Sequence, residues 1–132
     1  MEKQVLSIEQ MQHLQELGLD TSDASMHWQF LPTADSIING TDEVEKEPSL
    51  FVSQPNMRHE YPAYTLQDII NLLPIYIKWN SLIIVFNAVM YSAGYGEGYD
   101  NPLVVFDEKS LLESAYNMLC WVIENGYLET NK

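Results

Sequence analysis

The fold depends on one apolar stretch, IYIKWNSLIIVFNAVMYSA, at residues 75–93. Most of its side chains are β-branched or aromatic, and it lacks the polar stripe that an amphipathic helix shows about every 3.6 residues. Lys78, Asn80, Ser81 and Asn87 interrupt it, whereas a membrane-spanning helix needs roughly 20 uninterrupted apolar residues. We therefore predict strands here, with a single long helix as the competing interpretation.

Four strands are predicted from this stretch and its continuation, at residues 75–79, 82–87, 89–95 and 103–106. Asn80-Ser81 and the glycine-rich residues 96–102 supply turns between them. The run from Leu82 to Phe86 is apolar on both alternating faces, so we expect a central strand that is covered on both sides or nearly so.

Three helices are predicted from their end signals. They begin at Ser7, Thr65 and Asp107 and end at Gly18, Pro74 and Gly126. The first start is a capping box, in which Ser7 and Gln10 each satisfy a free backbone N–H. Along residues 109–125 the apolar residues form one arc of the helical wheel, which should pack on the sheet: Leu111, Leu112, Ala115, Tyr116, Met118, Leu119, Val122 and Ile123.

Two earlier strands complete the predicted fold. Residues 26–30 alternate apolar and polar, residues 50–53 form a second strand, and the acidic residues 33–49 between them are predicted to be a surface loop. The expected class is α+β, with an antiparallel sheet of about five to six strands packed with three helices in the order α-β-β-α-β-β-β-β-α. The length favours a single domain over residues 1–132.

Three stretches resemble a group of small acidic proteins from gut-bacterial genomes, carried by phages or mobile elements. They are residues 6–22, residues 64–69 and residues 115–127. The resemblance covers helices and their caps, and the group has no assigned activity, so it implies no site residue. It implies a bacterial and intracellular setting.

The charge of the chain restricts its partners. The formal net charge is −13, with only 6 basic residues, which argues against binding to nucleic acid or to an anionic membrane and favours solubility or a basic protein partner. Residues 1–4 lack the basic head of a secretory signal, and Cys120 is the only cysteine. We therefore predict a cytoplasmic protein without disulfides.

No set of residues in the sequence forms a recognisable catalytic, cofactor or metal motif. His13, His27 and His59 do not have the spacing that metal ligands share. Cys120 lies at the edge of the apolar arc and is best explained by packing, and Asp20 and Asp23 by turn formation. The chain is accordingly predicted to be a non-enzymatic interaction or regulatory module.

Trp121 is the candidate for an interface because it projects away from the apolar arc of the last helix. Either the first helix or the loop after Thr33 covers it, or it meets a partner, which includes a second copy of the chain. We group it with Asn117 and Glu124 of the same helix, and we place a second acidic surface at Glu43, Glu45 and Glu47.

An alternative function is the binding or hydrolysis of a small ligand. Tyr91, Tyr95 and Tyr99 cluster beside the glycine turn and are predicted to line a cleft near residues 91–99.

Overall fold

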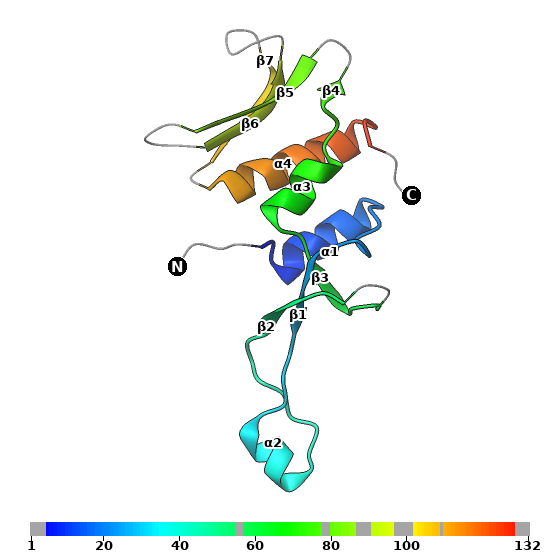
Figure 1. Cartoon of the computed structure of the whole chain (residues 1–132), viewed down its shortest axis with the longest axis vertical. Helices are drawn as coiled ribbons and strands as arrows, with labels where there is room; N and C mark the ends of the chain where they lie inside the picture. The colour runs from blue at the N-terminus through cyan, green and yellow to red at the C-terminus, as the bar shows by residue number, and fades with distance from the viewer. Residues whose placement is uncertain are drawn as a thin grey trace.

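A layer of helices lies between two antiparallel sheets (Figure 1). The computed structural model describes residues 5–54, 57–77, 80–86, 91–96, 102–108 and 110–128. Its elements are α1 (Ile8–Glu16), β1 (Met26–Gln29), α2 (Ala34–Asn39), β2 (Ser49–Val52), β3 (Tyr61–Ala63), α3 (Leu66–Leu72), β4 (Tyr76–Ile77), β5 (Asn80–Phe86), β6 (Tyr91–Gly96), β7 (Pro102–Glu108) and α4 (Leu111–Glu124). The predicted α+β class is confirmed, but the strands divide into two sheets.

The predicted caps of the first two long helices are confirmed. The Ser7 hydroxyl accepts a hydrogen bond from the Gln10 N–H at 3.1 Å, and the Ser7 N–H donates to the Gln10 side chain at 3.0 Å. Thr65 and Asp68 form the same box at the start of α3. That helix ends at Leu72 because Leu73 is extended ahead of Pro74, which disfavours helical geometry in its predecessor.

The stretch at residues 75–93 forms strands, so the competing long helix is wrong for its described residues. The sheet has the order β4-β5-β6-β7. Tyr95 of β6 stands opposite Leu82 on one side and Val104 on the other. Gly94 lies so close to β7 that an added Cβ would collide with the Val104 carbonyl oxygen, which explains the glycine.

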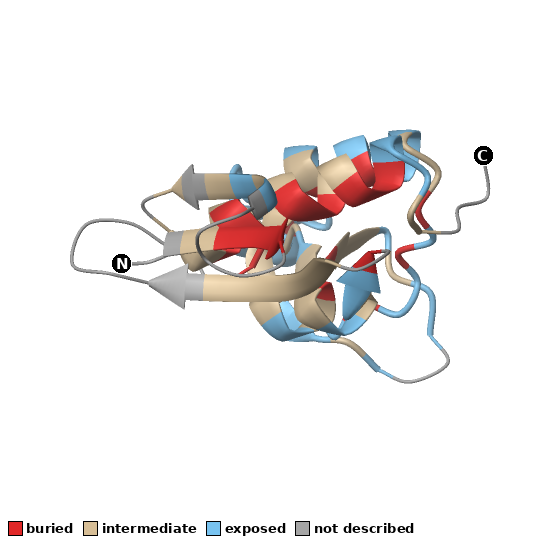
Figure 2. Ribbon diagram, turned by 90° about the horizontal axis from the view of Figure 1, so that it is seen from above, coloured by how far each residue is buried: buried red, intermediate tan, exposed pale blue. Residues whose placement is uncertain are grey.

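Helix α4 covers one face of this sheet, and its buried side also meets α3. Figure 2 shows the buried residues gathered where strands and helices face one another. The predicted arc is largely confirmed: Leu112, Ala115, Met118, Leu119, Val122 and Ile123 are buried. The predicted cap is wrong, because β7 extends to Glu108 and holds Asp107 in its ladder with Ser92. Ser110 caps the helix instead, accepting from the Glu113 N–H.

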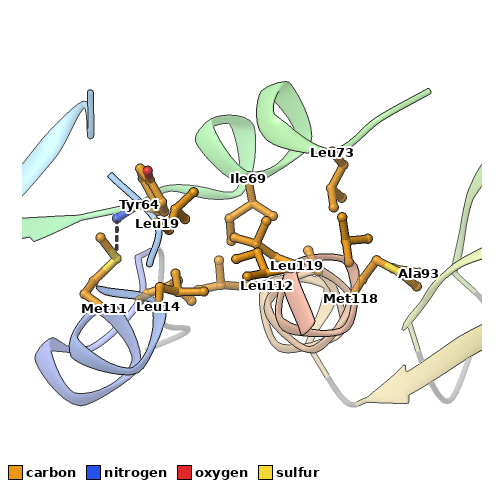
Figure 3. Packing of buried hydrophobic residues seen from close by; sticks show 14 of the residues in the cluster. Met11, Leu14, Leu19, Tyr64, Ile69, Leu73, Ala93, Leu112, Met118 and Leu119 are labelled. Atoms are coloured by element: carbon orange, nitrogen blue, oxygen red, sulfur yellow. Dashed lines mark hydrogen bonds between the residues drawn. The ribbon is translucent and has the colours of Figure 1, made fainter. Parts of the chain in front are cut away.

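The core joins α1, α3 and α4 to the sheets. Figure 3 shows Met11 of α1 beside Tyr64, Ile69 of α3 above Leu112 and Leu119 of α4, and Met118 of α4 beside Ala93. Tyr64, fully buried after β3, donates its N–H to the Met11 sulfur at 3.3 Å. The same apolar layer therefore holds both sheets.

The second sheet has three strands in the order β2-β1-β3. Met26 of β1 lies opposite Val52 of β2 and Ala63 of β3. The sequence did not predict β3, which is short and contains Pro62. Proline lacks the N–H that an interior strand donates, and it is tolerated here because β3 is an edge strand.

Residues 30–48 form an arm that projects from this sheet and ends in α2 (Figure 1). The predicted loop at residues 33–49 is thus wrong for 34–39, which are helical. Thr33 supplies the N-cap, and Gly40 ends the helix with a φ of 69°, a conformation that favours glycine. At the base of the arm the Glu45 N–H donates to the Leu31 carbonyl at 2.8 Å.

Candidate functional site

The tip of the arm exposes large apolar side chains. Ile37 and Ile38 of α2 are 69% and 79% exposed, and Val44, which pairs with Pro32 nearer the base of the arm, is 50% exposed. Apolar residues exposed singly are ordinary, but a contiguous group on a projection is typical of a binding surface. We call Ile37 and Ile38 the arm tip.

Local hydrogen bonds hold the arm tip in place. The Ser36 hydroxyl donates to the Thr33 carbonyl at 2.9 Å, and the Ser36 N–H donates to the Thr33 hydroxyl at 3.0 Å. Across the arm, the Thr33 N–H donates to the Glu43 carbonyl at 3.2 Å. Of the α2 residues, all of them described, Ser36 alone is buried. The helix therefore presents its isoleucines without using them in its own packing.

Exposed carboxylates lie along the arm. Glu43, Glu45 and Glu47, which the sequence analysis grouped as an acidic surface, are all exposed on the segment that returns from α2 to β2. Asp35 and Asp42 add two further exposed carboxylates, and Lys46 is the one basic residue of residues 30–48. The arm thus combines an apolar tip with a strongly negative flank.

Trp121 lies far from this arm, on α4 (Figure 1). It is half-buried against the core, and its ring stacks on Tyr127 with centroids 5.6 Å apart and planes at 26°. Tyr127 follows the turn at Gly126, so part of the cover comes from a residue that neither predicted alternative named. Asn117 donates to the Glu108 carboxylate at 3.0 Å, and Glu124 is exposed. The structure does not join these residues to the glutamates of the arm.

Tyr95 cannot line the predicted tyrosine cleft. This side chain is fully buried, and its hydroxyl donates to the Pro74 carbonyl at 2.7 Å. Burial raises its pKa to about 12, so it is a neutral core residue. Tyr99 and the side chain of Tyr91 lie outside the described residues. A ligand site that includes Tyr95 is therefore wrong.

Asp20 has the predicted turn role, whereas Asp23 accepts a hydrogen bond from the core residue Tyr64. Asp20 accepts a hydrogen bond from the Ser22 N–H at 3.0 Å, and this bond is the main reason that its pKa is lowered. Tyr64 donates its hydroxyl to Asp23 at 2.9 Å. Burial and the Asp23 carboxylate raise the pKa of Tyr64, so this bond tethers the turn to the core.

The sequence analysis missed a pair of stacked histidines. His27 of β1 is 8% exposed, and the ring of His59 lies over it with centroids 3.9 Å apart and planes at 14°. Phe51 also stacks on His27, at 5.8 Å. The two histidines are far apart in the sequence, and the signal that joins them, the order β2-β1-β3, is a tertiary one.

Two hydrogen bonds fix this pair. His27 Nδ1 lies 3.3 Å from the Ser53 hydroxyl, and the Gln54 N–H donates to His59 Nε2 at 3.2 Å. Burial and the neighbouring His59 lower the pKa of His27, while a hydrogen bond with Gln29 acts in the opposite direction. His27 is therefore neutral at pH 7.

An open cleft of about 1320 Å³ adjoins the pair, with Asp20, Asp23, Ser53, Arg58, His59 and Glu60 among its lining residues. Ser53 beside a neutral histidine has the composition of a nucleophile and a base. However, the Ser53 N–H donates to the Ser25 carbonyl and the Gln54 N–H to His59, so neither is free to stabilise an oxyanion. The geometry does not support acyl transfer.

Neither a group of metal ligands nor a membrane-spanning helix occurs in the part of the chain that the structure describes. In these residues, no three histidine, cysteine, aspartate or glutamate side chains come close enough together to hold a metal ion. None of the helices in the same residues has both the length and the apolar character needed to cross a bilayer.

Comparison with known proteins gives no match to a family model, to a curated protein or to a solved structure. The function has to be argued from the geometry of the chain itself.

Proposed function

We propose that this protein is a non-enzymatic interaction module that binds a basic protein through the arm. The observation that carries the proposal is the pair Ile37 and Ile38, exposed at the end of a hydrogen-bonded projection and flanked by five carboxylates and one lysine. An apolar pocket on the partner would receive the isoleucines, and lysines or arginines around that pocket would meet the carboxylates.

Each half of this surface has a distinct energetic role. Burying an isoleucine side chain contributes roughly 1.5–3 kcal/mol, so Ile37 and Ile38 supply most of the affinity. Exposed charges at the rim add little affinity but accelerate encounter, and salt screens their effect. The proposal therefore places affinity at the arm tip and salt dependence at Glu43, Glu45 and Glu47.

The resemblance to phage-carried proteins suggests a sharper version of the same proposal. An acidic protein of this kind would occupy the nucleic-acid site of a basic host protein. Duplex DNA should then compete with this chain for the partner. If this chain binds the partner at a different site, duplex DNA should not affect its binding.

The test uses the purified chain as bait in a bacterial lysate, followed by titration of each captured protein in pure form. We expect a basic protein whose affinity falls at least tenfold with Ile37→Ser/Ile38→Ser, because about 1.4 kcal/mol corresponds to a factor of ten. Val52→Ser is the matched control, since Val52 is 69% exposed on β2, outside the arm. Glu43→Gln/Glu45→Gln/Glu47→Gln should mainly slow association at low salt.

Two outcomes would contradict the proposal. One is a captured partner whose affinity is unaffected by the arm-tip substitutions. The other is concentration-dependent self-association of the purified chain in sedimentation, abolished by those substitutions, because the arm would then be the interface between two copies.

A further inference from the structure

The connection between β2 and β3 crosses the sheet. Both strands are antiparallel to β1 and flank it, so they run parallel to each other. Val52 lies opposite Met26 at the end of β2, and Tyr61 lies opposite Trp28 at the start of β3. The chain between them has to pass β1, and the stacking of His59 on His27 places His59 over the face that carries His27.

Few contacts hold the described residues of this connection, 53–54 and 57–60. The Ser53 N–H donates to the Ser25 carbonyl at 3.0 Å, and the Met57 N–H donates to the Gln54 carbonyl at 3.3 Å. Met57, Arg58 and Glu60 are exposed. The ring of His59, stacked on His27 and bonded to the Gln54 N–H, is the contact that fastens the later part of the connection.

Protonation of His27 opposes the stacking of the two rings. The Gln54 N–H donates to His59 Nε2, so that nitrogen carries no hydrogen and the neutral ring holds its proton on Nδ1. A charge on His27 would lie buried beneath the second ring, with centroids 3.9 Å apart.

We infer that His27 and His59 form a pH-sensitive clasp, which holds residues 57–60 on the sheet at neutral pH and releases them in mildly acidic solution. The sign follows from proton binding. Because the pKa of His27 is lowered in the closed state, that state binds fewer protons than an open one. The closed state is therefore favoured above about pH 6.5 and loses stability as the pH falls below it.

The groups around the pair do not supply a compensating charge. Gln29 of β1, Phe51 and Ser53 at β2, and Pro62 of β3 are neutral. Arg58 and Glu60 lie on the connection itself, and Asp20 and Asp23 line the cleft from the turn after α1. Within the described residues, none of these carboxylates forms an ion pair with either ring.

The chain offers a direct probe of the clasp, because Arg58 is its only arginine and is exposed on the connection. An arginine-specific protease therefore cuts the full chain at this one bond. The initial cleavage rate is measured at pH 7.5 and pH 5.5 and divided by the rate for a synthetic peptide of residues 53–63 under the same conditions. We expect this ratio to rise about fivefold at pH 5.5, as expected for losing one hydrogen bond and the stack.

Variants identify the group responsible. His59→Gln removes the ring that covers His27, so its ratio should rise less at pH 5.5 than that of the wild type. His13→Gln is the matched control, because His13 is exposed on α1 and should leave the wild-type rise intact. The circular dichroism spectrum should be the same at both pH values, which shows that the release is local.

Three results would overturn the clasp. The first is a wild-type ratio that is equal at the two pH values, and the second is a rise that persists unchanged in His59→Gln. The third is independent of cleavage: proton NMR titration in which His27 has a pKa at or above 6.5, the ordinary histidine value.

Discussion

At the scale of single residues, two glycines are required for different physical reasons. Gly94 faces the backbone of β7 so closely that a Cβ would collide with Val104, whereas Gly40 has open space around it and a φ of 69°. At Gly94 there is no room for a side chain, whereas at Gly40 there is room but the backbone conformation disfavours other residues. Their alanine variants therefore separate a steric cost from a conformational one.

We predict that Gly94→Ala lowers the free energy of unfolding by about 3 kcal/mol, because the rigid neighbour is backbone and β6 and β7 must move apart. Gly40→Ala should cost only about 1 kcal/mol. Urea denaturation of both variants measures these values. A Gly94→Ala cost no larger than that of Gly40→Ala would show that β7 yields easily.

The histidine pair shows why single residues mislead when they are considered alone. His27 lies in β1, where apolar and polar residues alternate, and His59 precedes the short strand β3. No sequence pattern links the two histidines. Their association depends on the placement of β2 and β3 on opposite sides of β1, a long-range pairing that local composition does not specify. Trp121 and Tyr127 lie closer in the sequence, and their stacking depends on the turn at Gly126 that the sequence did predict.

At the scale of elements, Asp68 joins a helix to a strand. Its carboxylate accepts from the Thr65 N–H at 3.0 Å within the capping box, and also from the Ser25 hydroxyl at 2.7 Å and the Ser25 N–H at 3.2 Å. The start of α3 is therefore tied to the residue that precedes β1. The sequence predicted the capping box, but it did not predict the hydrogen bonds to Ser25.

We predict that Asp68→Ala costs about 2 kcal/mol of stability, more than an isolated cap, whose loss costs typically ~1 kcal/mol. Ser25→Ala should cost less, and the double variant should cost less than the sum, since both remove one shared interaction. Urea denaturation of the double-mutant cycle measures the coupling. Gln67→Ala, an exposed change in the same helical turn, is the control. Strict additivity would mean that Ser25 and Asp68 do not interact.

At the scale of the whole molecule, the arm lies apart from the core. Within residues 30–48, Ser36 is the one buried residue, and the core residues come from the helical layer and the strands around it. An element that buries so little apolar area adds little to folding. Its exposed isoleucines are therefore better explained by binding than by stability.

We predict that replacing residues 34–42 with Asn-Gly, a two-residue hairpin turn, changes the free energy of unfolding by less than about 1 kcal/mol. The pairing of Pro32 with Val44 brings the two cut ends together. Urea denaturation, with the intact chain as reference, measures the difference. A loss above about 3 kcal/mol would mean that the arm supports the core, which would weaken the case for a dedicated binding element.

The sequence by itself determined the caps of α1 and α3, the apolar arc of α4, most strands and the α+β class. These features depend on interactions between residues a few positions apart, so composition and spacing suffice to predict them. The tertiary structure alone decided that the strands form two sheets, that residues 34–39 coil at the end of an arm, that Tyr95 is in the core and that His59 covers His27. Those outcomes depend on which distant segments bury one another, a competition over the whole chain that no local pattern encodes.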